Sequence, residues 1–330
     1  MMEERGLFKF AALLLIGLLV LGGLGWIIGG DESAEAAPVA LRDQPRADDA
    51  PPAPAQEADA PAAAADAVCV PGGGLKPLDA EIHESSGVAV SRAHAGIFWT
   101  HNDSGEPLLY AVDSLGHTAG RVRVTGAAVE DWEDVSLAPC PGGGDCLYVA
   151  DIGDNDAARP AVTVYRFPEP APGAGESAPA TAIRLRYPDG AQDAEAMFVL
   201  DGAIHVVTKG ESGPIAVYRA PADAAAGAAL ERVRQLSPGK VDRPERITSA
   251  DASADGRWIA VRTLRSLAIY PAAELTGSGE AAPRRVDLKA LDEAQGEGLG
   301  FTPDGSILLT SEGGKKDKPA TFARLSCTLR

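Results

Sequence analysis

The stretch that decides the fold is residues 131–166, which reads DWEDVSL at 131–137, LYVADIGDN at 147–155 and VTVYR at 162–166. The three runs are short and apolar, and segments that contain Gly, Pro or Asn separate them. Such runs predict antiparallel β-strands joined by turns. Acidic residues open the first run and close the second.

The same arrangement occurs five times between residue 84 and the C-terminus. Aligning Ser86, Glu133, Glu195, Thr248 and Glu297 gives intervals of 47, 62, 53 and 49 residues. A third strand follows each pair, and a looser fourth strand follows in the first four units. Four-stranded units at this spacing are typical of propeller blades. The paired strands of the other units are 84–90 with 97–103, 193–199 with 204–209, 248–253 with 258–262, and 296–301 with 307–312.

The fifth unit runs out of chain after its third strand, at 321–325. A ring of sheets leaves no exposed end, so the missing outer strand is predicted to come from residues 67–82. The predicted fold is all-β: a propeller of five four-stranded blades over 67–330, closed by an N-terminal strand. Six blades stay open if the 62-residue interval, or residues 66–83, contains another sheet.

The charge balance limits the partners. The chain of 330 residues has 30 basic and 47 acidic residues, a formal net charge of −17. Nucleic acid as the main partner is excluded, because its binding needs clustered Lys and Arg.

Residues 10–28 form an uncharged, mostly apolar run of 19 residues, which roughly spans a bilayer as a helix. Arg5 and Lys9 precede it and acidic residues follow it, so the remainder is expected outside the cytoplasm, periplasmic or at the cell surface. Residues 1–30 are therefore predicted to be a transmembrane membrane anchor. The alternative is a cleaved signal peptide with an A-x-A site at 34–36, which would release a secreted protein.

Residues 31–66 differ in composition from both neighbours. Of these 36 residues 14 are Ala, six are Pro, nine are acidic and two are basic. Such a segment buries too little apolar surface to offset its ordering entropy. It is predicted to be a disordered linker between anchor and propeller.

Four cysteines agree with an exported chain, in which an even count favours disulfides. Four cysteines allow three pairings. The preferred one joins Cys140 to Cys146 across a short turn and Cys69 to Cys327 as a clasp of the two ends of the domain.

The propeller geometry predicts where a site would lie. The first strand of each blade lines the channel, and the second returns to the face where the first began. The Asp-Gly turns at 201–202, 255–256 and 304–305 mark the opposite face. Glu133, Glu195 and Glu297 should then surround one mouth of the channel. Polar residues at second-strand ends should lie beside them as ligand-binding residues: Asn102, Asp103, Asp151, Asp154, Asn155, Lys209, Arg262 and Glu312, with His101.

Carboxylates that converge on one cavity need a metal ion or basic partners. Oxygen ligands favour a hard divalent cation, Ca²⁺ first, with Glu133, Glu195 and Glu297 as its ligands. The alternative is that these glutamates pair with Lys209 and Arg262 and close the channel. The run at 151–155 has the alternative of a plain turn, since Asp and Asn commonly follow strands.

The quoted motifs, together with FWTHNDSGE at 98–106 and SADASADGRW at 249–258, cover most of residues 84–313. In this order they resemble a family of exported bacterial β-propeller proteins without a settled activity. More distantly the chain is similar to SMP-30/gluconolactonase-like and phytase-like propellers, whose metal-binding carboxylates lie on one face. Thr248 and Ser86 stand where other units carry Glu, so the resemblance carries no such site over blade by blade.

Three functions follow. The first is a membrane-tethered extracytoplasmic propeller that binds a small ligand or an envelope protein through an acidic, cation-occupied face. The second is a metal-dependent hydrolase of a phosphoester or lactone, with His101 or Glu195 as candidate base. The third is a structural envelope module. The residues leave open whether the protein is an enzyme.

Overall fold

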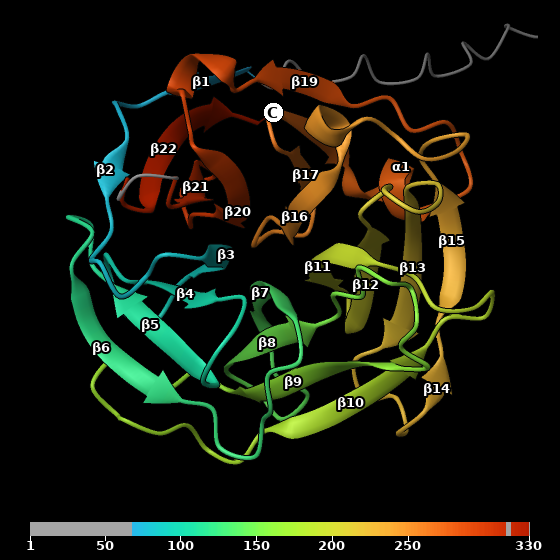
Figure 1. Ribbon diagram of the computed structural model, residues 1–330, viewed down its shortest axis with the longest axis horizontal. Coiled ribbons are helices and arrows are strands. Elements are labelled where there is room, and N and C mark those ends of the chain that lie inside the picture. Colours follow the sequence, from blue (N-terminus) through green and yellow to red (C-terminus); the bar gives the residue numbers. More distant parts are fainter. Residues whose placement is uncertain (1–67, 315–317, 330) are drawn as a thin grey trace, which may run out of the picture. The chain divides into compact units, whose positions relative to one another are not determined.

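The computed structural model describes residues 68–314 and 318–329, and these form an all-β propeller of five blades around a central channel (Figure 1). Neighbouring blades touch through their first strands, in the closed order β3, β7, β11, β16, β20 and back to β3. The predicted fold class is confirmed, with five blades rather than six.

Each blade is an antiparallel sheet whose strands follow one another from the channel outward. Blade A is β3 (Ser85–Val90), β4 (Phe98–Asn102), β5 (Leu108–Val112) and β6 (Thr118–Arg123). Blade B is β7 (Trp132–Pro139), β8 (Asp145–Asp151), β9 (Val162–Pro168) and β10 (Thr181–Arg186). Blade C is β11 (Ala194–Leu200), β12 (Ala203–Thr208), β13 (Ala216–Pro221) and β15 (Glu231–Gln235). Blade D is β16 (Ile247–Ala252), β17 (Trp258–Thr263), β18 (Ser266–Pro271) and β19 (Arg284–Asp287).

Blade E closes the ring with strands from both ends of the domain. Its chain-terminal part is β20 (Gln295–Phe301), β21 (Ile307–Glu312) and β22 (Thr321–Thr328). The fourth strand is β1 (Val68–Pro71), which pairs with β22, and β2 (Lys76–Pro77) extends the same edge. Cys69 lies opposite Cys327 in this register, and the two form a disulfide. The predicted closure is confirmed, as is the second disulfide, Cys140–Cys146.

The 62-residue interval contains no additional blade within the described chain. Its length lies in the loops of blade B and in the β10–β11 connection. The short strand β14 (Ala228–Ala229), from the loop before β15, adds to β10 as a parallel fifth strand. The few helical turns lie in loops: α1 (Ala272–Thr276), η1 (Arg243–Glu245) and η2 (Lys289–Leu291).

A buried carboxyl, Asp134, ties the first strands together across the channel. Its oxygens accept hydrogen bonds from the backbone N–H groups of Met197 at 2.9 Å and Ala250 at 3.1 Å, and from the Ser249 hydroxyl at 3.1 Å. The Ser249 oxygen in turn accepts the Leu299 N–H at 3.0 Å. Four blades are thus joined through hydrogen bonds that centre on one carboxyl.

Residues 1–67 lie outside the described residues, and so do the predicted anchor over 1–30 and the whole of the predicted linker over 31–66. The described part contains no helix long and apolar enough to cross a membrane. Two disulfides and no free cysteine in the described part indicate an oxidising, extracytoplasmic location.

Candidate functional site

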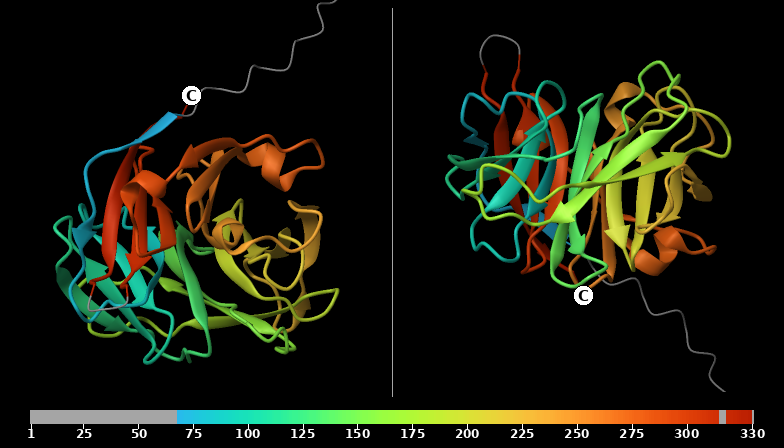
Figure 2. Two further views of the ribbon diagram at one scale, coloured as in Figure 1. Left: turned by 45° about the horizontal axis from the view of Figure 1, so that its top comes forward. Right: turned by 90° about the horizontal axis from the view of Figure 1, so that it is seen from below.

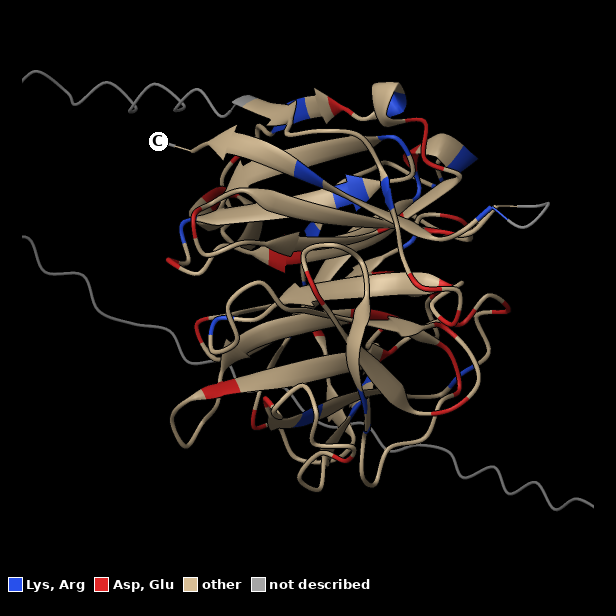
Figure 3. Ribbon diagram, turned by 90° about the vertical axis from the view of Figure 1, so that its left-hand side faces the viewer, with Lys and Arg blue, Asp and Glu red and all other residues tan. Residues whose placement is uncertain are grey.

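The strands run between two faces that differ in character (Figure 2, right). At the first, the turn face, lie the turns between the first and second strands of each blade, the end of β22 and both disulfides. At the second, first strands begin and second strands end. Figure 3 shows the ring edge-on, with acidic segments along the loops of the face opposite the C-terminus. The acidic mouth is defined as Glu84, Asp103, Asp131, Glu133, Asp193, Glu195, Glu297 and Glu312, with Lys209.

The three glutamates that open β7, β11 and β20 are almost completely buried at this mouth. Burial and the charge of Glu195 raise the pKa of Glu133 well above its usual value. Burial and the charges of Glu195 and Glu312 do the same for the pKa of Glu297. These carboxyls therefore influence one another across the channel, as the alignment of the five units requires.

Lys209 is the basic centre of the acidic mouth. Its ammonium group contacts Glu195 directly and lies 3.6 Å from Asp193 Oδ2 and 3.6 Å from Glu211 Oε2. It also donates to the Asn155 side-chain oxygen at 3.1 Å. Burial disfavours its charge, but the carboxylates of Glu195, Asp193 and Glu133 together outweigh burial and raise the pKa of Lys209. Burial still raises the pKa of Glu195 to about 7.

Arg262 lies at the end of β17, and its pairing differs from the one the sequence suggests. The guanidinium is fully buried and donates to the Gly298 and Thr310 carbonyls, at 2.7 and 2.9 Å. Its ion-pair partner is Glu293, at 2.5 Å, rather than Glu297. A Cβ on Gly296 would lie 2.1 Å from the guanidinium, so glycine is needed there. Arg262 is thus a structural brace below the mouth.

A second group of mouth carboxyls lies at the junction of blades A and E. Burial, then the neighbouring Glu84, raises the pKa of Asp103 to about 7. Burial, then Asp103, raises the pKa of Glu312 to about 7. Glu312 accepts a hydrogen bond from the Gln295 amide at 2.9 Å. Within the described chain neither Asp103 nor Glu312 has an ion-pair partner.

The run at 151–155 forms a turn that also supports the mouth. Asp151 pairs with Arg159 at 2.7 Å, and Asp154 accepts the backbone N–H groups of residues 158 and 159 at 2.8 Å. A Cβ on Gly153 would lie 2.3 Å from Glu133 Oε1, so its backbone forms the wall against which that carboxylate rests. Asn155 alone in this run reaches Lys209.

His101 and Asn102 have structural surroundings. Burial lowers the pKa of the fully buried His101 to about 4, so its ring is neutral, and its edge meets Trp132. The Asn102 side chain accepts the N–H groups of His83 and Glu84 at 3.1 and 3.0 Å. It donates to the Glu81 carbonyl at 3.0 Å, so it holds the chain that enters β3.

The predicted metal ligands Glu133, Glu195 and Glu297 lie at the acidic mouth. Among the described residues, no group of three or more His, Cys, Asp or Glu side chains is set to hold one. The reason is visible at Glu195, where the Lys209 ammonium group takes the position of a cation. The predicted ligand set of Glu133, Glu195 and Glu297 is brought to one mouth but does not form a metal centre as it stands.

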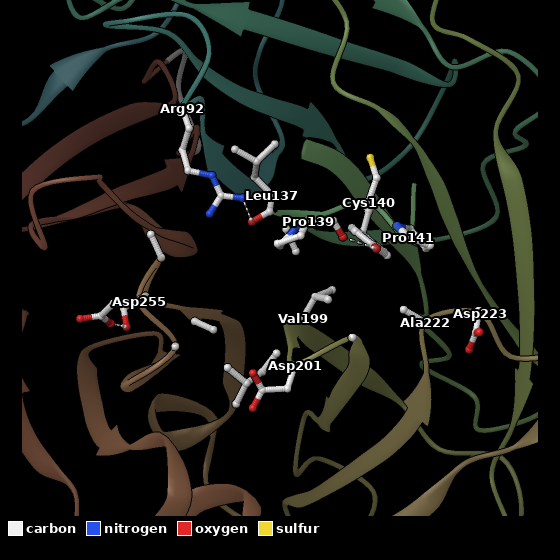
Figure 4. A pocket seen from close by; sticks show the side chains of 18 residues that line it. Arg92, Leu137, Pro139, Cys140, Pro141, Val199, Asp201, Ala222, Asp223 and Asp255 are labelled. Atoms are coloured by element: carbon white, nitrogen blue, oxygen red, sulfur yellow. Dashed lines mark hydrogen bonds between the residues drawn. The ribbon is translucent and has the colours of Figure 1, made fainter. Parts of the chain in front are cut away.

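A pocket of about 450 Å³ lies at the turn face (Figure 4). Its labelled residues include Asp201, Asp223 and Asp255 from exposed turns and Arg92, whose guanidinium pairs with Asp145 at 2.6 Å. None of the predicted site residues lines it apart from Cys140 of the disulfide.

Sequence reasoning missed Asp131, Asp193, Arg159 and Glu293. Asp131 and Asp193 stand just before the aligned strands, two residues from Glu133 and Glu195, so the repeat itself carried a signal for them. Arg159 and Glu293 lie in loops outside the repeat, and no spacing marks them.

No protein-family model and no curated protein matches the chain. Among solved structures, it is similar to the PQQ-bound aldose sugar dehydrogenase from Streptomyces coelicolor, with 10% identity and a TM-score of 0.48, over 80% of this chain and 99% of that one. It is also similar to the calcium-binding protein regucalcin from Agrobacterium tumefaciens, with 13% identity and a TM-score of 0.42, over 77% and 94%. At this level no function passes from these proteins to this chain.

Proposed function

We propose that the acidic mouth of this extracytoplasmic propeller binds a cation or the cationic group of a ligand. Residues 1–66 would hold the propeller off the membrane. The observation that carries the proposal is the group of carboxyls on Asp103, Asp131, Glu133, Glu297 and Glu312, which lack a basic partner among the described residues. A structural ion-pair plug would leave few carboxyls unpaired, because each buried, unpaired charge costs stability.

Lys209 is an internal counter-ion in this proposal. It neutralises Glu195 and Asp193 while the mouth is empty, and an arriving cation competes with it for these carboxylates. Oxygen donors of this kind suit Ca²⁺, which is the simplest probe of the site. Ca²⁺ would be held by Glu133 and Glu297, joined by Glu195 once Lys209 has moved away.

The test is a titration of the full chain with Ca²⁺ by calorimetry, in the wild type and in Glu297→Gln. The variant keeps the size of the side chain and removes its charge, and we expect at least tenfold weaker binding, about 1.4 kcal/mol. Asp304→Asn on the turn face is the matched control and should bind as the wild type does. Equal affinity in all three proteins would refute the proposal.

The hydrolase alternative has no specific observation in its favour. His101 is fully buried with a neutral ring, and Glu195 is paired with Lys209. A screen for lactonase, esterase and phosphatase activity with Ca²⁺ present tests it directly. Turnover that Glu195→Gln abolishes would replace the binding proposal with an enzymatic one.

A further inference from the structure

A cavity of about 210 Å³ lies beside the acidic mouth, on the same face, between blades D and E. Its walls come from the loops before β16, after β17 and before β20. Three basic side chains line it: Arg243, Arg265 and Lys289. The exposed Asp292 and the buried side chain of Glu293 also line it, and Glu293 is already paired with Arg262, so basic groups remain in excess in this cavity beside the acidic mouth.

These three basic side chains retain donors for a ligand. All three residues are exposed, and the Arg265 guanidinium has no hydrogen-bond or ion-pair partner among the described residues. Lys289 has only the exposed Asp287, at 3.7 Å, and such surface pairs are weak. Arg243 makes a single contact, from Nη2 to Gln295 Oε1 at 3.3 Å. Arginine donors in this state suit an oxyanion such as phosphate or carboxylate.

Gln295 connects the cavity to the mouth. Its carbonyl oxygen accepts from Arg243, and its amide nitrogen donates to Glu312 Oε2 at 2.9 Å. Glu297, two residues along the same strand, belongs to the mouth. The anionic and cationic positions are therefore one glutamine side chain apart.

A buried atom without a partner lies in the wall between the two sites. Glu293 lines the cavity, its side chain is 4% exposed, and its Oε2 pairs with Arg262. Its Oε1 has no hydrogen-bond partner in the described part of the chain. A carboxylate oxygen in this position calls for a donor, and a ligand with an N–H group next to its anion supplies one.

We propose that the ligand is a small soluble zwitterion, whose oxyanion binds Arg243, Arg265 and Lys289 in the cavity and whose ammonium group binds the acidic mouth. This rests on the proposed function for the cationic half only. The cavity supplies the anionic half by itself.

The test uses 3-aminopropylphosphonate, with propylphosphonate as the matched probe that lacks the amine, on the full chain. We expect the zwitterion to bind at least tenfold more tightly than propylphosphonate. Arg243→Gln with Arg265→Gln should weaken both probes at least tenfold, because both need the cavity. Glu297→Gln should weaken only the zwitterion. Arg257→Gln, an exposed arginine on the turn face, is the control and should change neither.

Propylphosphonate binding that the double variant leaves unchanged, or no binding at all, would overturn the cavity. Equal affinity for the two probes would overturn the zwitterion. If the wild-type protein binds propylphosphonate but does not bind Ca²⁺, the proposed function is refuted and the cavity proposal is not. Sedimentation with phosphatidylethanolamine vesicles, lost in the double variant, would overturn a soluble ligand in favour of a lipid headgroup.

Discussion

The turn face and the acidic mouth both carry carboxyls at the ends of strands, but the pKa values of exposed turn carboxyls such as Asp255 and of buried mouth carboxyls such as Glu133 move in opposite directions. At the turn face, burial opposes the charge of Asp255, but the hydrogen bonds from Ser253 and Arg257 together outweigh it and lower the pKa of Asp255 to about 2. At the mouth, burial and neighbouring carboxylates raise the pKa values. Asp255 is satisfied within its own turn, whereas Glu133 and Glu297 have other mouth carboxyls among their nearest charged neighbours. Both disulfides also lie on the turn side, so the covalent links of the ring are on the face opposite the acidic mouth.

Removal of the Cys69–Cys327 disulfide at the turn face should give the largest loss of stability. Cys69 and Cys327 are 258 residues apart, and replacing both by Ser should cost about 5–6 kcal/mol by loop entropy, a model-dependent value. Urea unfolding with and without the substitutions measures it. Ca²⁺ affinity of the folded variant should not change, and a weaker affinity would break the division between the faces.

The brace below the mouth comes next. Arg262→Met leaves Glu293 buried without its partner, and we expect a loss of about 3–5 kcal/mol. Adding Glu293→Leu should restore most of the stability, because an apolar pair can replace a buried ion pair. The denaturant midpoints of the single and the double variant measure this. If the double variant is no more stable than Arg262→Met, Arg262 acts through the Gly298 and Thr310 carbonyls instead.

The free energy of unfolding should fall as the pH rises above 6.5. With pKa values raised to about 7, Asp103, Glu195 and Glu312 hold protons in the folded state that the unfolded chain has released. Stability is then fully present below their ordinary pKa and is lost as pH rises through 7. His101 and His205, whose pKa values burial lowers to about 4, oppose this trend only up to about 6.5.

Melting temperatures should therefore fall between pH 6.5 and 8, by about 2–4 °C for each kcal/mol. Saturating Ca²⁺ should reduce the fall, since it favours the ionised carboxylates. Glu312→Gln should also reduce it. A melting temperature that rises over this interval would contradict the assignment of the mouth.

The smallest effect belongs to the exposed pair of the turn face. Arg257→Gln removes the partner of Asp255, at 2.7 Å, and should cost about 0–1 kcal/mol. Its melting temperature should follow that of the wild type from pH 5 to 8. A different pH profile in this variant would show that the two faces are coupled.

The sequence predicted the ring because the missing strand of the fifth unit and the spare strand before the first unit complement each other. It also predicted that Glu133, Glu195 and Glu297 share a mouth, since period and strand direction place them there. It did not predict that Arg262 pairs with Glu293, because a loop residue outside the repeat has no register. The raised pKa values depend on burial, which the alignment of strands does not give.

In the proposed function, the Lys209 ammonium group occupies the position beside Glu195 and Asp193 that a bound cation would take. The most direct test is the Ca²⁺-induced change in melting temperature of the full chain, compared between the wild type and Lys209→Met. We expect a larger stabilisation by Ca²⁺ in the variant, corresponding to at least tenfold tighter binding, because Glu195 and Asp193 become free to bind the ion. A variant that is destabilised to the same extent with Ca²⁺ and with chelator would contradict it and show that Lys209 is a structural plug.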